Sequence, residues 1–413
     1  MNYCLNSMAF YFFLPLYMAT ALLFIFFNVP EEFYFGIFSL LTCVTLPVLF
    51  SMLVFPLRMN LNQYYQGIKN RPQYNFIILP FCFFIILFAP LDIYVNGFKW
   101  FDPISYSDVQ GVGRYIRHVT ILCWVLVPVA FLYIHRPVIK IAFILYAILF
   151  PIIIVDRNRF FISGYSLFLC LVFTYNSIQS KKLKKISKIF FYFLPVAAVL
   201  IFSIIGKFRS GNAFMVDSSG IFLAEGYYPL SEAFSHLPYL LQQVVIYIAT
   251  PILNFSTVVA ENFINPDFLL SQFSPFSRDN FEAYPFSPIL VPRFNVGTEF
   301  YPFLLYGGLP LVILAIIFLV LSFNVASLLF KKYPNIFTFL IFIKISYSVL
   351  FMGFAPQFFI FLNLMFVVLM MFLWFFSAFI KDSLGHSRTH ERIFDGPLRL
   401  SNGQNINNSE KYR

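Results

Sequence analysis

Long, uninterrupted apolar runs recur from one end of this sequence to the other, and each is about as long as a membrane-crossing helix. The hydrocarbon core of a bilayer is about 30 Å thick, which an α-helix spans with about 20 residues. Only 11% of the residues are charged, whereas soluble domains carry about 25%. The runs are continuous and lack the alternation of transmembrane β-strands. The sequence therefore predicts an all-α polytopic membrane protein.

About ten of these runs are predicted to span the membrane. Their approximate bounds are 9–28, 33–55, 74–95, 119–134, 138–155, 160–177, 190–206, 302–323, 336–354 and 357–380. The first run has neither a basic start nor a small-residue cleavage site, so we expect a retained helix and not a removed signal peptide. The five cysteines show no metal or redox spacing and are expected to be packing residues.

The placement of Lys and Arg predicts that both termini are cytoplasmic. With the N-terminus inside, most of the 28 basic residues fall in inside loops and the C-terminal tail, and most acidic residues fall outside. Basic loops stay on the cytoplasmic side of a membrane. Topology therefore explains the net charge of +10, which gives no reason to expect a nucleic-acid partner.

One external segment of about 95 residues dominates the predicted organisation. The chain divides into a seven-helix N-terminal part (1–206), the large periplasmic loop (207–301), three C-terminal helices (302–380) and a disordered cytoplasmic tail (381–413). Loops of this length are usually functional or disordered. The aromatics, prolines and apolar stretches of this loop indicate that it is ordered.

Residues 238–259 within the loop are long and apolar enough to span the membrane. A single added span would place Lys331 and Lys332 outside and make the tail external. Gln242, Gln243 and Pro251 also suit a lipid-facing span poorly. We therefore expect an amphipathic or re-entrant helix, with a true span as the alternative.

Arginines on the outer side need a reason, because the topology rule disfavours them there. The stretch Asp156-Arg157-Asn158-Arg159 is predicted to be a tight turn at the outer membrane edge, and Lys207 and Arg209 lie where the seventh span emerges. Arg278 and Arg293 lie in the large loop. Arginine binds phosphate through two donors and keeps its charge, so the group indicates an anionic, lipid-linked substrate. The alternative is that these arginines bind ordinary phospholipid headgroups or pair with neighbouring carboxylates.

Two further sets of residues could carry chemistry. His236 and Glu232 are one helical turn apart and could act as base and orienting group, although a solvated loop histidine is the simpler reading. Lys344 lies near the middle of the ninth span, where an ionisable residue is a functional candidate, with Asn363 as a weaker polar companion. Both could instead be packing contacts inside the bundle. Metal-ligand spacings, a phosphate-binding Walker loop and a serine-hydrolase elbow are all missing from the sequence.

Three local stretches resemble a known group of proteins. They are VDRNRFFISGYSLFL (155–169), IGKFRSG (205–211) and RFNVGTEFYPFLLYGGLPLVIL (293–314). Together with the whole-chain architecture, they make the sequence similar to the Wzy-type O-antigen polymerases, the oligosaccharide repeat-unit polymerases of Gram-negative inner membranes. The related O-antigen ligases tend to carry a histidine in the third stretch, where this chain has Asn295 and Thr298.

The resemblance implies a multi-pass protein of the bacterial inner (cytoplasmic) membrane that transfers a growing glycan from undecaprenyl pyrophosphate to a new lipid-linked repeat unit. It implies membrane lipid, the undecaprenyl-pyrophosphate-linked oligosaccharide, a chain-length regulator and a flippase as partners, with no cofactor and no metal. The expected catalytic residues are Arg209, Arg159, His236 and Glu232. The expected substrate-binding residues are Arg157, Lys207, Arg278, Arg293, Asn295 and Thr298. The alternatives are an O-antigen ligase and a lipid-linked oligosaccharide flippase.

Overall fold

Helices build the part of the chain that the computed structural model describes, which comprises residues 5–55, 61–69, 74–101, 111–175, 180–210, 230–273 and 296–394. In chain order they are α2 (Met8–Phe26), η1 (Glu31–Phe33), α3 (Tyr34–Val54), α4 (Leu61–Lys69), α5 (Asn75–Asn96), α6 (Gly111–Thr120), η4 (Ile121–Val125), α7 (Leu126–Tyr133), α8 (Pro137–Ile153), α9 (Arg157–Tyr175), α10 (Lys181–Ser210), α11 (Glu232–Ser235), α12 (Tyr239–Glu261), α13 (Pro266–Phe273), α14 (Tyr301–Lys332), α15 (Ile336–Phe351) and α16 (Phe361–Phe394).

The predicted class of multi-pass helical membrane protein is confirmed. Within the described ranges, six helical stretches are long and apolar enough to cross a membrane: Met8–Phe26, Glu31–Val54, Phe76–Asn96, Gly111–Tyr133, Leu240–Glu261 and Tyr301–Lys332. Shorter apolar helices cover Pro137–Ile153, Val196–Gly206, Ile336–Phe351 and Phe361–Ser377. The number of ten spans and the cytoplasmic position of both termini stay predictions.

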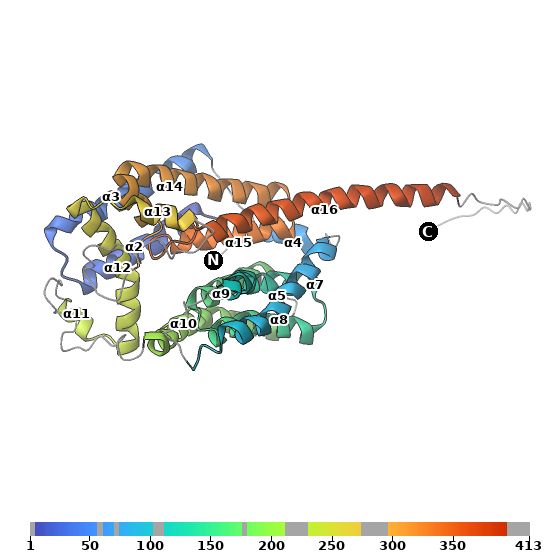
Figure 1. The fold of residues 1–413 in the computed structure, drawn as a ribbon, viewed down its shortest axis with the longest axis horizontal. Coiled ribbons are helices and arrows are strands. Elements are labelled where there is room, and N and C mark those ends of the chain that lie inside the picture. The colour runs from blue at the N-terminus through green and yellow to red at the C-terminus, as the bar shows by residue number, and fades with distance from the viewer. Residues whose placement is uncertain are drawn as a thin grey trace, which may run out of the picture.

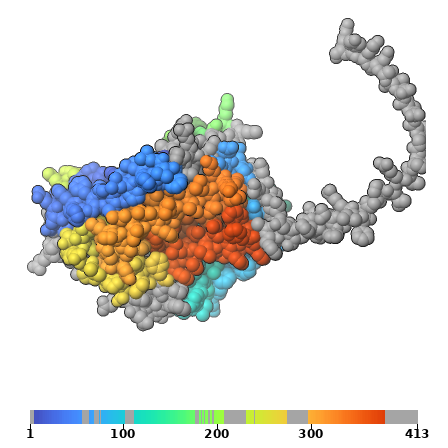
Figure 2. Space-filling model, turned by 90° about the horizontal axis from the view of Figure 1, so that it is seen from above, coloured from blue at the N-terminus to red at the C-terminus, as the bar shows by residue number. Residues whose placement is uncertain are grey.

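The helices form two groups that face each other (Figure 1). One group contains α5 and α7 to α10, and the other contains α2, α3, α12, α14 and α15. The start of α16 joins the second group, and its far end extends beyond the other helices in Figure 1. In Figure 2 the orange surface of α14 separates the blue N-terminal helices from the red surface of α16. The boundary between the two groups holds the cavities described below.

The helix α9 begins earlier than the sequence indicates. We expected a tight turn over Asp156–Arg159, but Arg157 is the first helical residue, so both arginines lie in the first turn of α9. The reason is an N-cap, because the Asp156 carboxylate accepts a hydrogen bond from the backbone N–H of Arg159 at 3.1 Å. Such a cap satisfies a donor that the helix itself leaves unpaired.

The start of the C-terminal tail also differs from the prediction. The helix α16 continues to Phe394, so the first part of segment 381–413, expected to be disordered, is helical. The rest of that segment lies outside the described residues.

Residues 238–259, expected to be an amphipathic or re-entrant piece, form most of one continuous helix, α12. It packs against α2 and α3 and ends at Asn262, whose left-handed backbone (φ 51°) closes the last turn. The helix is long and apolar enough to span, yet in Figure 1 it runs across the direction of α14 and α16. Its re-entrant placement stays a prediction.

A break divides α14 into a short buried start and a long apolar remainder. At the break Gly308 has φ 68° and ψ −164°, a backbone conformation that is essentially restricted to glycine. The start, Tyr301–Leu305, is buried and follows directly on Thr298 and Glu299. The break therefore sets the direction in which α14 leaves the candidate site.

Candidate functional site at the first turn of α9

The first turn of α9 lies between two cavities. The first, called the polar cavity below, has a volume of about 330 Å³ and lies between α6, η4, α9, α15 and α16. Its polar lining residues are His118, Asn158, Arg159, Lys344, Tyr347 and Asn363, and the rest of its lining is apolar. The sequence singled out Arg159, Lys344 and Asn363 separately, and the structure brings them together.

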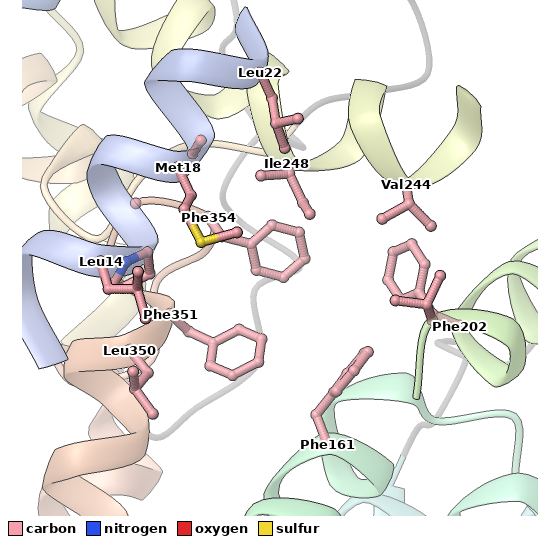
Figure 3. A pocket seen from close by; sticks show the side chains of 14 residues that line it. Leu14, Met18, Leu22, Phe161, Phe202, Val244, Ile248, Leu350, Phe351 and Phe354 are labelled. Carbon is pink, nitrogen blue, oxygen red and sulfur yellow. The ribbon is translucent and has the colours of Figure 1, made fainter. Parts of the chain in front are cut away.

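The second, called the apolar cavity, has a volume of about 310 Å³ and an almost entirely apolar lining. Figure 3 shows Phe161 and Phe202, from one helix group, facing Leu14, Met18 and Phe351 of the other group across the space. Because α9 contributes Phe161 here and Arg159 to the polar cavity, a single helical turn borders both.

Arg159 is almost completely buried, with 2% of its surface exposed, and each nitrogen of its guanidinium lies close to a protein oxygen. Its Nε lies 2.9 Å from Oδ2 of Asp156. Its Nη1 donates to the Thr120 hydroxyl at 3.1 Å and lies 3.9 Å from Oδ2 of Asp92. Its Nη2 donates to the Arg117 carbonyl at 3.3 Å. Arg159 therefore joins α5, α6 and α9. Its donors face protein groups, whereas the sequence led us to expect an arginine whose donors are open to a phosphate.

Asp92 is the centre of this network and is fully buried. Its carboxylate accepts hydrogen bonds from the Thr120 hydroxyl and the Asn96 amide, each at 2.6 Å. It also pairs with Arg117, whose Nη2 lies 3.3 Å away. A buried carboxylate needs such compensation, because its removal from water costs several kcal/mol. We refer to Asp92, Arg117, Thr120, Asp156 and Arg159 as the Asp92 network.

Two aromatic rings hold Arg157. Its guanidinium carbon lies 4.7 Å from the ring centre of Phe202 and 4.8 Å from that of Tyr247. Cations are attracted to the faces of aromatic rings, most strongly where water is excluded, and Arg157 is buried. Since Phe202 also lines the apolar cavity, Arg157 carries a positive charge close to the wall of that cavity.

A hydrogen-bonded lattice fixes the start of α9 against the segment between α15 and α16. The Asn158 amide donates to Oε1 of Gln357 at 3.1 Å, and the Tyr347 hydroxyl donates to Oδ1 of Asn158 at 2.7 Å. The Asn363 amide donates to the Gln357 carbonyl. Three of the polar side chains that line the polar cavity are thus held by protein partners.

Glu299, an acidic residue near the end of the large loop, is a structural group. Its carboxylate accepts hydrogen bonds from the backbone N–H groups of Gln357, Phe358 and Phe359, the last two at 2.8 to 3.0 Å. Burial raises the pKa of Glu299 to about 7, although these N–H groups and the charge of Lys344 oppose the rise. Glu299 therefore fixes the backbone that presents Gln357 to Asn158.

We expect Glu299→Gln to lower the free energy of unfolding by about 1–3 kcal/mol, because an amide cannot accept all of these hydrogen bonds and leaves buried donors unsatisfied. The thermal unfolding temperature of the detergent-purified protein measures the effect. Glu261→Gln is the matched control, since Glu261 is exposed at the end of α12. Equal unfolding temperatures for the two variants would contradict this role.

Two of the other expected site residues, Glu232 and His236, lie apart from the polar cavity. Glu232 and His236 are exposed on and beside α11, which packs on α2. Within the described residues, no hydrogen bond or ion pair joins Glu232 to His236 or either of them to the polar cavity. Thr298 is buried beside Glu299. The remaining expected residues lie outside the described side chains: Lys207 and Arg209, which belong to the last turn of α10, and Arg278, Arg293 and Asn295.

Comparisons with protein-family models, curated proteins and solved structures find no match.

His118 and Tyr347 line the polar cavity but were not among the site residues expected from the sequence. His118 directly precedes the predicted fourth span, but the helix in fact starts at Gly111, and His118 is in α6. A signal was present, because Arg114, Arg117, His118 and Thr120 give α6 a strongly polar face within an otherwise apolar stretch. Among the described residues, no cluster of three His, Cys, Asp or Glu side chains suits a metal ion.

Proposed function

We propose that this protein is a membrane glycosyltransferase that polymerises undecaprenyl-pyrophosphate-linked oligosaccharide repeat units at the outer face of the inner membrane. The observation that carries the proposal is the pair of cavities on either side of the first turn of α9. A lipid-linked oligosaccharide needs an apolar surface for its isoprenoid chain and a polar, cationic site for its head. Together with the resemblance of the sequence to O-antigen polymerases, this arrangement favours such a substrate.

The proposed reaction needs positioned groups more than a cofactor. The acceptor hydroxyl oxygen forms a bond to the anomeric carbon, and the bond from that carbon to the phosphate oxygen breaks. Its electron pair leaves with the pyrophosphate, and the hydroxyl proton passes to a base. Fixed cationic groups stabilise the departing charge, and a rigid site holds the acceptor in line. The Asp92 network and the Glu299 contacts supply that rigidity by fixing both walls of the polar cavity.

We assign the base to His118, in place of His236, because His118 lines the polar cavity. Imidazole is the side chain best suited to accept a proton near neutral pH. The other polar lining groups are amides, a phenol, a guanidinium and an ammonium group. His236 lies outside this cavity and is exposed, directly after the end of α11.

His118→Gln is therefore expected to reduce polymer formation by about 100-fold or more, in line with the usual contribution of general base catalysis. The lipopolysaccharide ladder of complemented cells reports polymer, and immunoblotting of membranes reports protein abundance. The exposed His135, between α7 and α8, provides the control His135→Gln, for which we expect a normal ladder. Loss of polymer in His236→Gln together with a normal ladder in His118→Gln would reverse the assignment.

Clean deletion of the gene tests the function itself. A polymerase deletion should leave a single repeat unit on the lipopolysaccharide core, with no ladder, and the wild-type gene should restore the ladder. Complete loss of O-antigen units would instead indicate the ligase or the flippase. We favour the enzyme over the flippase because the polar residues that line the polar cavity gather around the first turn of α9.

A further inference from the structure

Lys344 and His118 differ from the other polar residues of the polar cavity. Asn158, Tyr347 and Asn363 belong to the hydrogen-bonded lattice, and Arg159 belongs to the Asp92 network. Within the described part of the chain, the side chains of Lys344 and His118 make neither a hydrogen bond nor an ion pair. The cavity therefore presents one cationic side chain that no protein group satisfies, Lys344.

The surroundings of Lys344 make an unmatched ammonium group expensive. Lys344 lies in the middle of α15, is 8% exposed, and is flanked by buried residues along that helix. Its Nζ lies 6.0 Å from the ring centre of Tyr347. Burying an isolated charge is strongly unfavourable, and ionisable residues inside a membrane protein usually mark a functional site.

One carboxylate acts on Lys344 from a distance. Glu299 interacts with it electrostatically but lies beyond ion-pair distance. The oxygens of Glu299 are already occupied by the backbone N–H groups of residues 357–359. The three donors of the Lys344 ammonium group thus remain for a ligand that enters the cavity.

We propose that Lys344 is the anion-binding residue of the polar cavity and that its ligand is a phosphoryl anion. In a step that rests on the proposed function, this anion is the pyrophosphate of the lipid-linked substrate. Arg159, which the sequence favoured for that task, is then a positioning residue whose own charge is balanced by Asp92 and Asp156. The volume of about 330 Å³ lies within the range of small-molecule sites.

Binding to the purified full-length protein in detergent tests this assignment without an activity assay. Titration with inorganic pyrophosphate should raise the unfolding temperature of the wild type saturably. Lys344→Met should weaken binding at least tenfold, and Lys344→Arg should retain most of it. Lys344→Met is expected to fold, because replacing an unmatched buried charge by an apolar side chain is neutral or stabilising. The control is Lys331→Met, at the exposed end of α14, which should bind like the wild type.

Two further ligands in the same binding assay identify the source of the anion. Farnesyl pyrophosphate should bind more tightly than inorganic pyrophosphate if the site belongs to a prenyl-linked substrate. If phosphatidylglycerol vesicles displace pyrophosphate as well as farnesyl pyrophosphate does, the site still binds a phosphoryl group, but its ligand is a membrane headgroup. Absence of saturable binding, or equal affinity in Lys344→Met, would overturn the inference. The two experiments can fail independently. If pyrophosphate binding depends on Lys344 but deletion of the gene leaves the lipopolysaccharide ladder intact, the anion site stands and only the proposed function falls.

Discussion

Replacing Arg159 by alanine is expected to abolish polymer formation and to destabilise the protein by about 3–5 kcal/mol. The energy follows from breaking a buried charge network, because Asp92 and Asp156 both lose the guanidinium that pairs with them. The ladder of complemented cells and the unfolding temperature of the purified variant measure the two effects. Arg136→Ala is the control, since Arg136 is exposed at the start of α8 and should change neither quantity.

Arg159→Lys separates geometry from charge at the same position. Lysine keeps the positive charge, but a single ammonium group cannot reproduce the planar fork that reaches Asp156, Thr120 and the Arg117 carbonyl together. We expect near-normal abundance in the membrane with most of the polymer lost. Full rescue by lysine would show that the site needs only a charge there, and the positioning role would fall.

Gly36→Ala and Gly164→Ala are expected to change stability in opposite directions. Gly36 is a point of close approach between α3 and α12, where an added Cβ would lie 2.6 Å from the Cα of Ser256. Both helix backbones would have to move apart, which typically costs about 1–3 kcal/mol, and Gly36→Val should be worse. Around Gly164, on α9, the space for a Cβ is open. Alanine there should stabilise the helix by about 0.5–1 kcal/mol.

Unfolding temperatures of the two alanine variants, measured side by side in one detergent, check this prediction. It matters for the architecture, because the close approach at Gly36 is part of what holds α12 against the N-terminal helices. Equal temperatures for Gly36→Ala and the wild type would mean that α12 does not pack on α3 as described.

Much of the helical pattern was predictable from the sequence, because a chain in lipid must satisfy its own backbone groups and a helix does so locally. The expected span at 138–155 corresponds to Pro137–Ile153, and the span at 74–95 corresponds to Asn75–Asn96. The predicted helix boundaries were wrong where polar side chains determine the start of a helix. The Asp156 N-cap starts α9 two residues before Arg159, and the polar face of α6 extends the predicted fourth span toward Gly111.

The candidate site was only partly predictable. The sequence pointed to Arg157 and Arg159 through the topology rule and to Lys344 through its place in an apolar run. It gave no sign that Arg159 would be balanced by Asp92, since the two are far apart in the chain and Asp92 lies within a predicted span. It pointed to His236 in the long loop, and His118, which directly precedes a predicted span, was not among the expected site residues.

The sequence by itself thus determined the class of protein, the approximate positions of most helices and the presence of unusual charges. Tertiary structure alone decided which charges are already balanced and which face a cavity. The physical reason is that helices such as α2 and α3 are apolar all round, so periodicity does not show which face meets a neighbour. The partners of Asp92, Glu299 and Lys344 were settled only when distant segments packed together, because a buried charge is tolerated only where the fold supplies its counterpart.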